Sequence, residues 1–147
     1  MLRRDLHSIL SVGCCGDGSI PDVFSWKRPA NLGLRDGKLA ACKRSPNCVS
    51  SQASPSDGEH YIAPMHCTMA AVRSAVQSMP GSTIISEKEN YLYAEFRTQL
   101  LRFVDDVEFF FDGTVVHVRS CSRLGRRDFG VNRKRVEALR GLIEARR

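Results

Sequence analysis

The stretch VEFFFDGTVVHV, at residues 107–118, decides the fold of this chain. Apolar residues dominate both of its halves, and the Asp112-Gly113 pair between them is a strong signal for a β-hairpin with a two-residue turn. The pattern therefore predicts two antiparallel strands, at residues 107–111 and 114–122.

A two-residue turn fixes which residues of the two strands face each other. One face of the hairpin is then apolar, and we expect it to contact helices: it pairs Phe109 with Val116 and Val107 with Val118. On the other face acidic side chains meet basic ones: Glu108 meets His117 and Asp106 meets Arg119. Each such pair would contribute about 0.2–1 kcal/mol, and a slip by one residue would bury the charges, so the pattern favours this pairing.

Two more strands and two helices are predicted around the hairpin. Thr68 can cap a helix at residues 69–79 with its hydroxyl group, and Pro80-Gly81 ends that helix. Residues 82–87 are β-prone, and residues 91–97 alternate as a half-buried strand does. A last helix, at residues 132–145, carries one apolar stripe of Val136, Leu139 and Ile143.

The order of these elements, α-β-β-β-β-α, predicts an α+β fold: a four-stranded antiparallel sheet with two helices packed on one face, preceded by an extended N-terminal arm. Residues 1–67 are dense in Gly, Pro, Ser, Asn and Asp and show no sustained periodicity. We expect residues 1–30 to form an extended or partly mobile arm. Residues 31–147 would then be a single domain, with its sheet-and-helix core at residues 67–147.

The face of the sheet away from the helices mixes aromatic and charged side chains. By alternation it carries Tyr91, Tyr93, Glu95, Arg97, Glu108, Phe110, His117 and Arg119. Such a face could be a binding platform, a solvated face of the kind common in antiparallel sheets, or a face covered by the N-terminal arm. The sequence leaves these alternatives open.

Length and composition restrict the classes of protein to which the chain can belong. The chain has 147 residues, enough for one domain, and its 42% hydrophobic and 26% charged residues exclude wholesale disorder and a collagen-like chain. No run approaches the roughly 20 apolar residues of a membrane span. The opening Met-Leu-Arg-Arg is similar to the basic end of an export signal, but the apolar stretch at residues 9–12 is too short for a signal core. We therefore expect no processed signal, which makes the cytoplasm the default compartment.

The net charge of +6 is placed unevenly. Residues 119–147 hold ten Lys and Arg against three Asp and Glu, whereas the rest of the chain is close to neutral. Such a basic C-terminal region favours acidic partners, either phosphate groups, anionic surfaces or an acidic protein. The structural alternative is that these side chains are simply solvated on a terminal helix.

Six cysteines are too few and too scattered for a disulfide scaffold. Cys42 and Cys48 enclose a tight loop whose ends can approach to disulfide distance, so a disulfide between them is the favoured interpretation. Free thiols are one alternative. A zinc site is another, with Cys42, Cys48, His60 and either His66 or Cys67 as ligands.

Four stretches, in order, resemble the motifs of the domain of unknown function 1499 family. They are LGLRDG at residues 32–37, a run from Cys42 through SPNCVSS at residues 45–51, FVDDVE at residues 103–108, and VRSCSRLG followed by DFGVNRKR, at residues 118–125 and 128–135. The similarity runs from about residue 30 to the end. It implies a small protein that is often exported or membrane-associated, and it carries over no established biochemical activity.

The densest charged constellation joins the hairpin to the start of the last helix. In the functional interpretation, an anionic group is bound by the side chains of Arg119, Arg123 and Arg133. The start of the last helix, near residues 128–132, adds free backbone N–H groups that can donate to the same anion. The structural alternative is that ion pairs and caps merely tie strand, loop and helix together. The candidate ligand-binding residues are Asp105, Asp106, Arg119, Ser120, Ser122, Arg123, Asp128, Asn132 and Arg133.

The sequence therefore predicts a non-catalytic binding module for an anionic small molecule or an acidic partner, at the Arg- and Asp-rich end of the sheet. The first alternative is an enzyme that uses the carboxylates of Asp105, Asp106 and Asp128 as acid or base. The second is nucleic-acid binding through the basic C-terminal region, although no motif for it is present. No cofactor is expected, and the oligomeric state stays open.

Overall fold

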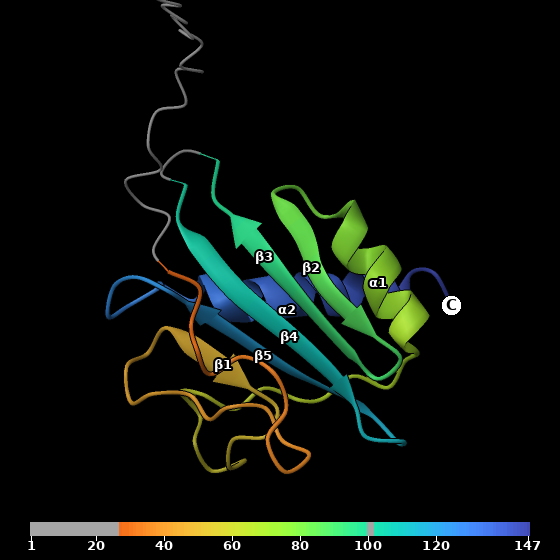
Figure 1. Ribbon diagram of the computed structural model, residues 1–147, viewed down its shortest axis with the longest axis horizontal. Coiled ribbons are helices and arrows are strands. Elements are labelled where there is room, and N and C mark those ends of the chain that lie inside the picture. The colour runs from red at the N-terminus through yellow and green to blue at the C-terminus, as the bar shows by residue number, and fades with distance from the viewer. Residues whose placement is uncertain (1–26, 100–101) are drawn as a thin grey trace, which may run out of the picture.

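The computed structural model describes residues 27–99 and 102–147, and the expectation for an arm at residues 1–30 falls mostly outside them. Within these residues, no helix has both the length and the apolar character needed to cross a membrane. The elements, shown in Figure 1, are β1 (Cys48–Ser50), α1 (Met69–Ser78), β2 (Ser82–Lys88), β3 (Tyr91–Arg97), β4 (Val104–Phe111), β5 (Val116–Ser122) and α2 (Val131–Glu144).

The fold is α+β with an antiparallel sheet and two helices, but the sheet has five strands, in the order β1-β5-β4-β3-β2, and not the predicted four. The additional strand, β1, comes from the segment expected to be an irregular arm. It is only three residues long and all three are buried, so it shows no alternation from which a strand could be predicted. β1 pairs with β5 and thereby closes one edge of the predicted sheet.

The predicted register of the β4–β5 hairpin is wrong by two residues. Phe109 faces Val118 and Glu108 faces Arg119, because the loop spans residues 112–115 and not two residues. The Asp112 carboxylate accepts hydrogen bonds from the backbone N–H groups of Thr114 (2.8 Å) and Val115 (2.9 Å), which closes a longer turn. A shift by two preserves the faces, because side chains alternate with a period of two.

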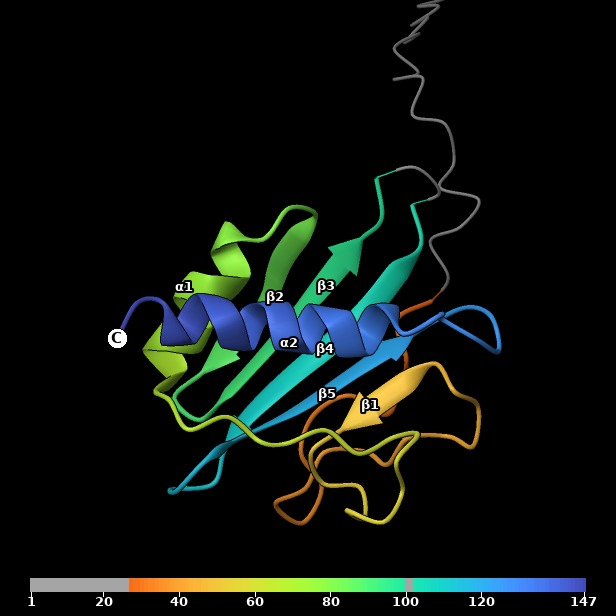
Figure 2. The ribbon, with the colours of Figure 1, turned by 180° about the vertical axis from the view of Figure 1, so that it is seen from behind.

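One face of the sheet packs against both helices, as Figure 2 shows. The four residues on which the hairpin prediction depends are fully buried in this core: Val107, Phe109, Val116 and Val118. The helix stripe of Val136, Leu139 and Ile143 joins them. The predicted cap of α1 is confirmed, since the Thr68 hydroxyl accepts a hydrogen bond from the Ala71 backbone N–H at 3.1 Å.

Part of the opposite face of the sheet, which we call the outer face, is covered by the segment that starts at residue 27 (Figure 1). Leu32 and Leu39 of this segment pack with Tyr91 and Tyr93 of β3 in a second, smaller apolar cluster. β3 is consequently buried on both faces, with only Arg97 exposed. The structure therefore shows that this segment covers the part of the outer face formed by β3 and β4, whereas β2 stays largely exposed.

Two glycines with positive φ offer a matched test of the fold. Gly81, after α1, has φ +78°, and a Cβ added there would lie 2.3 Å from the carbonyl oxygen of Arg97. Gly113, in the hairpin loop, has φ +100° and nothing within 4 Å of an added Cβ. We expect Gly113→Ala to lower the free energy of unfolding by about 1–2 kcal/mol, the cost of a left-handed L-residue, and Gly81→Ala to lower it by clearly more.

Urea unfolding followed by circular dichroism measures both variants. Equal losses would contradict the close approach of the α1–β2 turn to the end of β3.

Candidate functional site

The predicted site residues divide between the two faces of the sheet. Alternation along β4 and β5 turns Asp105, Ser120 and Ser122 toward the helices, and turns Asp106 and Arg119 toward the covering segment. The predicted constellation is therefore two clusters with a sheet between them.

The cluster on the outer face is an ion network centred on Arg123. Its guanidinium donates from Nε to Asp106 Oδ2 (2.8 Å) and from Nη2 to Asp106 Oδ1 (2.7 Å) and Glu95 Oε1 (2.7 Å). The side chains of Arg123, Asp106 and Glu95 are 6%, 2% and 7% exposed. This guanidinium is thus engaged by two buried carboxylates of the sheet.

The covering segment supplies a second cation to this network. Arg28, whose side chain is 51% exposed, donates to Glu95 Oε1 at 2.7 Å, and the Tyr93 hydroxyl donates to Asp106 Oδ1 at 2.5 Å. Burial alone would raise the pKa of Glu95, but the hydrogen bonds from Arg123 and Arg28 outweigh it, and the pKa is lowered. Burial together with the bond to Asp106 raises the pKa of Tyr93. The Glu95 carboxylate is therefore held ionised beneath the segment.

A second ion pair lies beside the first. Glu108 accepts hydrogen bonds from the backbone N–H of Gly33 and the hydroxyl of Tyr91, both at 2.7 Å, and from Nη1 of Arg119 at 3.3 Å. The predicted pairing of Arg119 with Asp106 is wrong, because the register shift brings Arg119 opposite Glu108. Arg119 is buried, and its Nε has no hydrogen-bond partner among the described residues.

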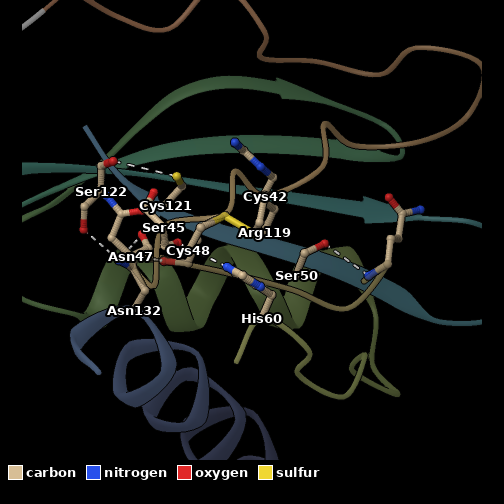
Figure 3. Close-up of a disulfide and its surroundings, with 12 residues drawn as sticks. Cys42, Ser45, Asn47, Cys48, Ser50, His60, Arg119, Cys121, Ser122 and Asn132 are labelled. Carbon is tan, nitrogen blue, oxygen red and sulfur yellow. Dashed lines mark hydrogen bonds between the residues drawn. A yellow bond between two sulfur atoms is a disulfide. The ribbon is translucent and has the colours of Figure 1, made fainter. Parts of the chain in front are cut away.

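The cluster on the helix side is organised by Asn132, which is fully buried. Its Oδ1 accepts from the Ser120 hydroxyl (2.6 Å), and its Nδ2 donates to Ser122 Oγ (2.8 Å), Asp128 Oδ2 (2.8 Å) and the carbonyl of Asn47 (3.2 Å). One amide group thus joins α2 to β5, to the loop before α2 and to the residue that precedes β1 (Figure 3).

Arg135 completes this cluster and was missed in the sequence. It donates from Nη2 to Asp105 Oδ2 (2.5 Å) and from Nη1 to Asn132 Oδ1 (2.8 Å), and its guanidinium lies 4.9 Å from the ring centroid of Phe96. Arg135 directly precedes Val136, so it lies at the edge of the apolar stripe of α2, and this position could have indicated that it is buried. The sequence analysis instead expected the run of basic residues to which it belongs to be solvated.

The start of α2 is already occupied by a carboxylate. Asp128 accepts hydrogen bonds from the backbone N–H groups of Gly130 (2.9 Å) and Asn132 (3.1 Å). Burial alone would raise the pKa of Asp128, but the hydrogen bonds from Asn132 and Gly130 lower it. An external anion at this helix start would therefore compete with a side chain of the protein itself.

A cavity of about 390 Å³ lies at this end of the sheet, and we call it the end pocket. Its wall is mostly apolar, with contributions from Phe103, Leu124, Phe129 and Val131. Three of the predicted site residues reach it: Asp105, Ser122 and Asp128. Arg127 also lines it, is exposed, and has no ion-pair partner among the described residues.

The basic C-terminal region is largely engaged by the protein itself. Arg133, a predicted site residue, donates to the carbonyls of Gly58 and Glu59 at 3.4 and 3.2 Å, away from both clusters. Arg140 donates in the same way to the carbonyls of Ala63 and Pro64. These arginines fasten the segment before α1 onto α2.

A chain of hydrogen bonds from Asp112 through His117 to Ser51 resembles a hydrolytic triad in composition. The distances are 2.8 Å between His117 Nε2 and Asp112 Oδ2 and 3.2 Å between His117 Nδ1 and Ser51 Oγ. However, Ser51 is buried, and its Oγ accepts the backbone N–H of Val118 at 2.9 Å. These hydrogen bonds therefore tie Ser51, the residue after β1, to β5.

The predicted disulfide between Cys42 and Cys48 is present, with the two Cα atoms 5.7 Å apart (Figure 3). Both sulfurs are bonded, so they offer no thiolates for the zinc site considered as an alternative. In the part of the chain that the structure describes, no group of three or more His, Cys, Asp and Glu side chains is arranged to hold a metal ion. The His60 ring instead forms hydrogen bonds with Asp57 Oδ2 (2.8 Å) and with the backbone carbonyl of Ser45 (3.1 Å). Of these two partners, Ser45 lies inside the loop that the disulfide closes.

Comparison with protein-family models gives a match over most of the chain. A family model described as protein of unknown function (DUF1499) matches residues 38–143, well over half of the chain. The matched region contains the cluster around Asn132, the end pocket and, apart from Arg28, the ion network around Arg123. No curated protein matches the chain significantly.

The ion network on the outer face makes a prediction for stability. Replacing Arg123 with Met leaves Asp106 and Glu95 buried without their main cation, so we expect the free energy of unfolding to fall by about 3–5 kcal/mol. Arg133→Met is the matched control. It removes only hydrogen bonds to surface carbonyls and should cost about 1 kcal/mol or less. Chemical denaturation measures the free energy of unfolding of both variants. A similar small decrease for both would refute a structural role of the network.

The contacts of His60 predict a pH dependence. Burial alone would lower its pKa, but the bonds to Asp57 and Ser45 outweigh it, so the pKa of the folded state lies above the ordinary 6.5. The stability that protonated His60 contributes is then fully present below about pH 6.5 and is lost as the pH rises through the raised pKa.

Thermal melts of the wild type and His60→Gln should therefore differ most below pH 6.5 and converge toward pH 9. His66→Gln, whose ring makes no hydrogen bond to the described residues, is the control and should show no such trend. A gap that is constant with pH would contradict the contribution of the imidazolium.

Proposed function

The chain belongs to the DUF1499 family of proteins of unknown function, and we propose that it is a non-catalytic binding domain whose site is the end pocket. Its ligand would be a small amphiphilic anion, with an apolar body and one anionic group. Phe103, Leu124, Phe129 and Val131 would contact the apolar body, and Arg127 would contact the anionic group.

The observation that carries this proposal is the charge balance of the pocket. Two carboxylates reach the pocket, and both are compensated: Asp105 by Arg135 and Asp128 by backbone N–H groups. The cation Arg127 has no such compensation within the described residues. An apolar cavity in the size range of small-molecule sites, with one unneutralised cation at its wall, is complementary to an amphiphilic anion.

The conformation of Phe129 supports a role in binding. This residue is 87% exposed and its φ is +53°, a left-handed conformation that is rare and strained for a bulky residue. Strain of this kind is maintained where the surrounding structure imposes it, and it concentrates at ligand sites. Burying this ring against a ligand would recover part of the free energy that its exposure costs.

The two alternatives have less support. For an enzyme, Asp106 lies on the other face of the sheet from Asp105 and Asp128, and the pKa of Asp128 is lowered, opposite to what a general acid needs. For nucleic-acid binding, several C-terminal arginines donate to carbonyls of the protein itself, as Arg133 and Arg140 do.

A titration with 1-anilinonaphthalene-8-sulfonate tests the proposal, because this probe joins an apolar ring system to one sulfonate. We expect saturable binding with enhanced fluorescence, and displacement of the probe by dodecanoate. Arg127→Gln should weaken binding about fivefold, the equivalent of roughly 1 kcal/mol for an exposed ion pair. Val131→Trp, which fills the cavity from an exposed position, should abolish saturable binding.

Arg126→Gln is the matched control, since this neighbouring residue carries the same charge and does not line the pocket. It should bind the probe as the wild type does. Equal weakening by Arg126→Gln and Arg127→Gln would show that the probe responds to surface charge alone, and it would refute the site.

A further inference from the structure

Three of the cysteines meet at the pairing of β1 with β5. Cys48 of β1 is bonded to Cys42, and its register partner on β5 is Cys121, whose thiol is free. Figure 3 shows Cys121 beside the disulfide loop. The free thiol thus lies on the strand next to the disulfide, at the same level.

The hydrogen bonds around this pair determine how close its side chains come. Antiparallel partners alternate between hydrogen-bonded and non-hydrogen-bonded pairs. The bonds from Ser122 N to Asn47 O and from Ser51 N to Val118 O, both 2.9 Å, mark their own pairs as hydrogen-bonded. Cys48 and Cys121, one step from the first of these, are therefore a non-hydrogen-bonded pair.

In a pair of that kind the Cα atoms lie about 4.5 Å apart and the side chains stand closest. This separation falls within the range of about 4.4–6.8 Å that a disulfide spans. A bond between Cys48 and Cys121 thus needs no rearrangement of the strands.

We propose that Cys121 is a thiol–disulfide exchange partner, so that Cys48 alternates between a bond to Cys42 and a bond to Cys121. The Cys121 thiolate attacks Cys48 Sγ, the new sulfur–sulfur bond forms, and the bond between Cys48 and Cys42 breaks. Cys42 leaves with the electron pair as a thiolate and takes up the proton that Cys121 has given to solvent. One disulfide is replaced by another, so the step needs neither an oxidant nor a reductant.

The exchange changes the surface and leaves the sheet in place. Cys48 stays fastened to β5, whereas Cys42 becomes a free thiol at the wall of a cavity of about 270 Å³. Cys42 is partly exposed, and the exposed cations Lys43 and Arg44 follow it directly. The product therefore presents the free thiol of Cys42, beside two exposed cations, in place of the free thiol of Cys121.

The rate should rise with pH, because the thiolate is the nucleophile. Burial raises the pKa of Cys121, and the charges of Asp106 and Asp105 raise it further, against the lowering effect of Arg119 and Lys43. The exchange is thus slow at neutral pH and faster in alkaline solution.

Alkylation with iodoacetamide in the absence of reductant tests the proposal. The full chain carries Cys14→Ser and Cys15→Ser, so that Cys67 and Cys121 are its free thiols. Peptide mapping should find the label accumulating on Cys42 together with a linked Cys48–Cys121 peptide pair, faster at pH 9 than at pH 7. Adding Cys121→Ser should abolish the labelling of Cys42.

Two controls distinguish this exchange from other routes. The rate of labelling at Cys42 should not depend on protein concentration, as an intramolecular step requires. Cys67 packs against the core on the helix side and should never be linked to Cys48.

A Cys42→Ser variant gives a second measurement. After mild oxidation it should contain the Cys48–Cys121 bond. Label confined to Cys67 and Cys121 at every pH, or an oxidised Cys42→Ser variant without that bond, would overturn the proposal.

Discussion

The pairing of Arg123 with two buried carboxylates is the constraint on which the rest of the structure depends. Asp106 and Glu95 lie on the middle strands of the sheet, under the segment that starts at residue 27, and neither can be left there without a cation. Arg123 provides it from just beyond β5, and Arg28 adds a second cation from the segment itself. The covering segment thus adds its own cation to the network, and β3 is buried on both faces beside it.

This constraint also determines which cations at this end of the sheet are already paired within the protein. The sequence predicts that the guanidinium of Arg123 binds an anion, but in the structure it is paired with carboxylates of the sheet. On the other face, Asn132 and Arg135 form hydrogen bonds with Ser120 and Asp105. What remains at that end of the sheet is an apolar cavity with Arg127 at its wall. The site that we propose therefore depends on Arg127, in the loop that follows β5, and not on the arginines predicted from the sequence.

The sequence predicts the faces of the sheet better than its pairing. Period-two alternation places Phe109 in the core whatever the loop length, so this part of the prediction is confirmed. The register depends on whether Asp112 acts as a turn residue or as a side-chain acceptor, and a dipeptide does not distinguish the two. The sequence analysis did not predict β1, because three consecutive buried residues show no alternation of apolar and polar side chains. The role of Arg135 was missed because its partner Asp105 lies 30 residues away in the sequence.

The motif at residues 118–125 can be understood from the position of β5 between two polar clusters. Its alternate residues serve opposite faces: Ser120 and Ser122 reach Asn132, whereas Arg119 and Cys121 face the covering segment. A single strand thus needs small hydroxyl side chains on one side and cations on the other, which accounts for the density of the motif without a catalytic role. Arg127 lies just beyond this strand and takes part in neither cluster. The contacts of these two clusters therefore do not account for its place at the pocket wall, whereas the proposed anionic ligand would.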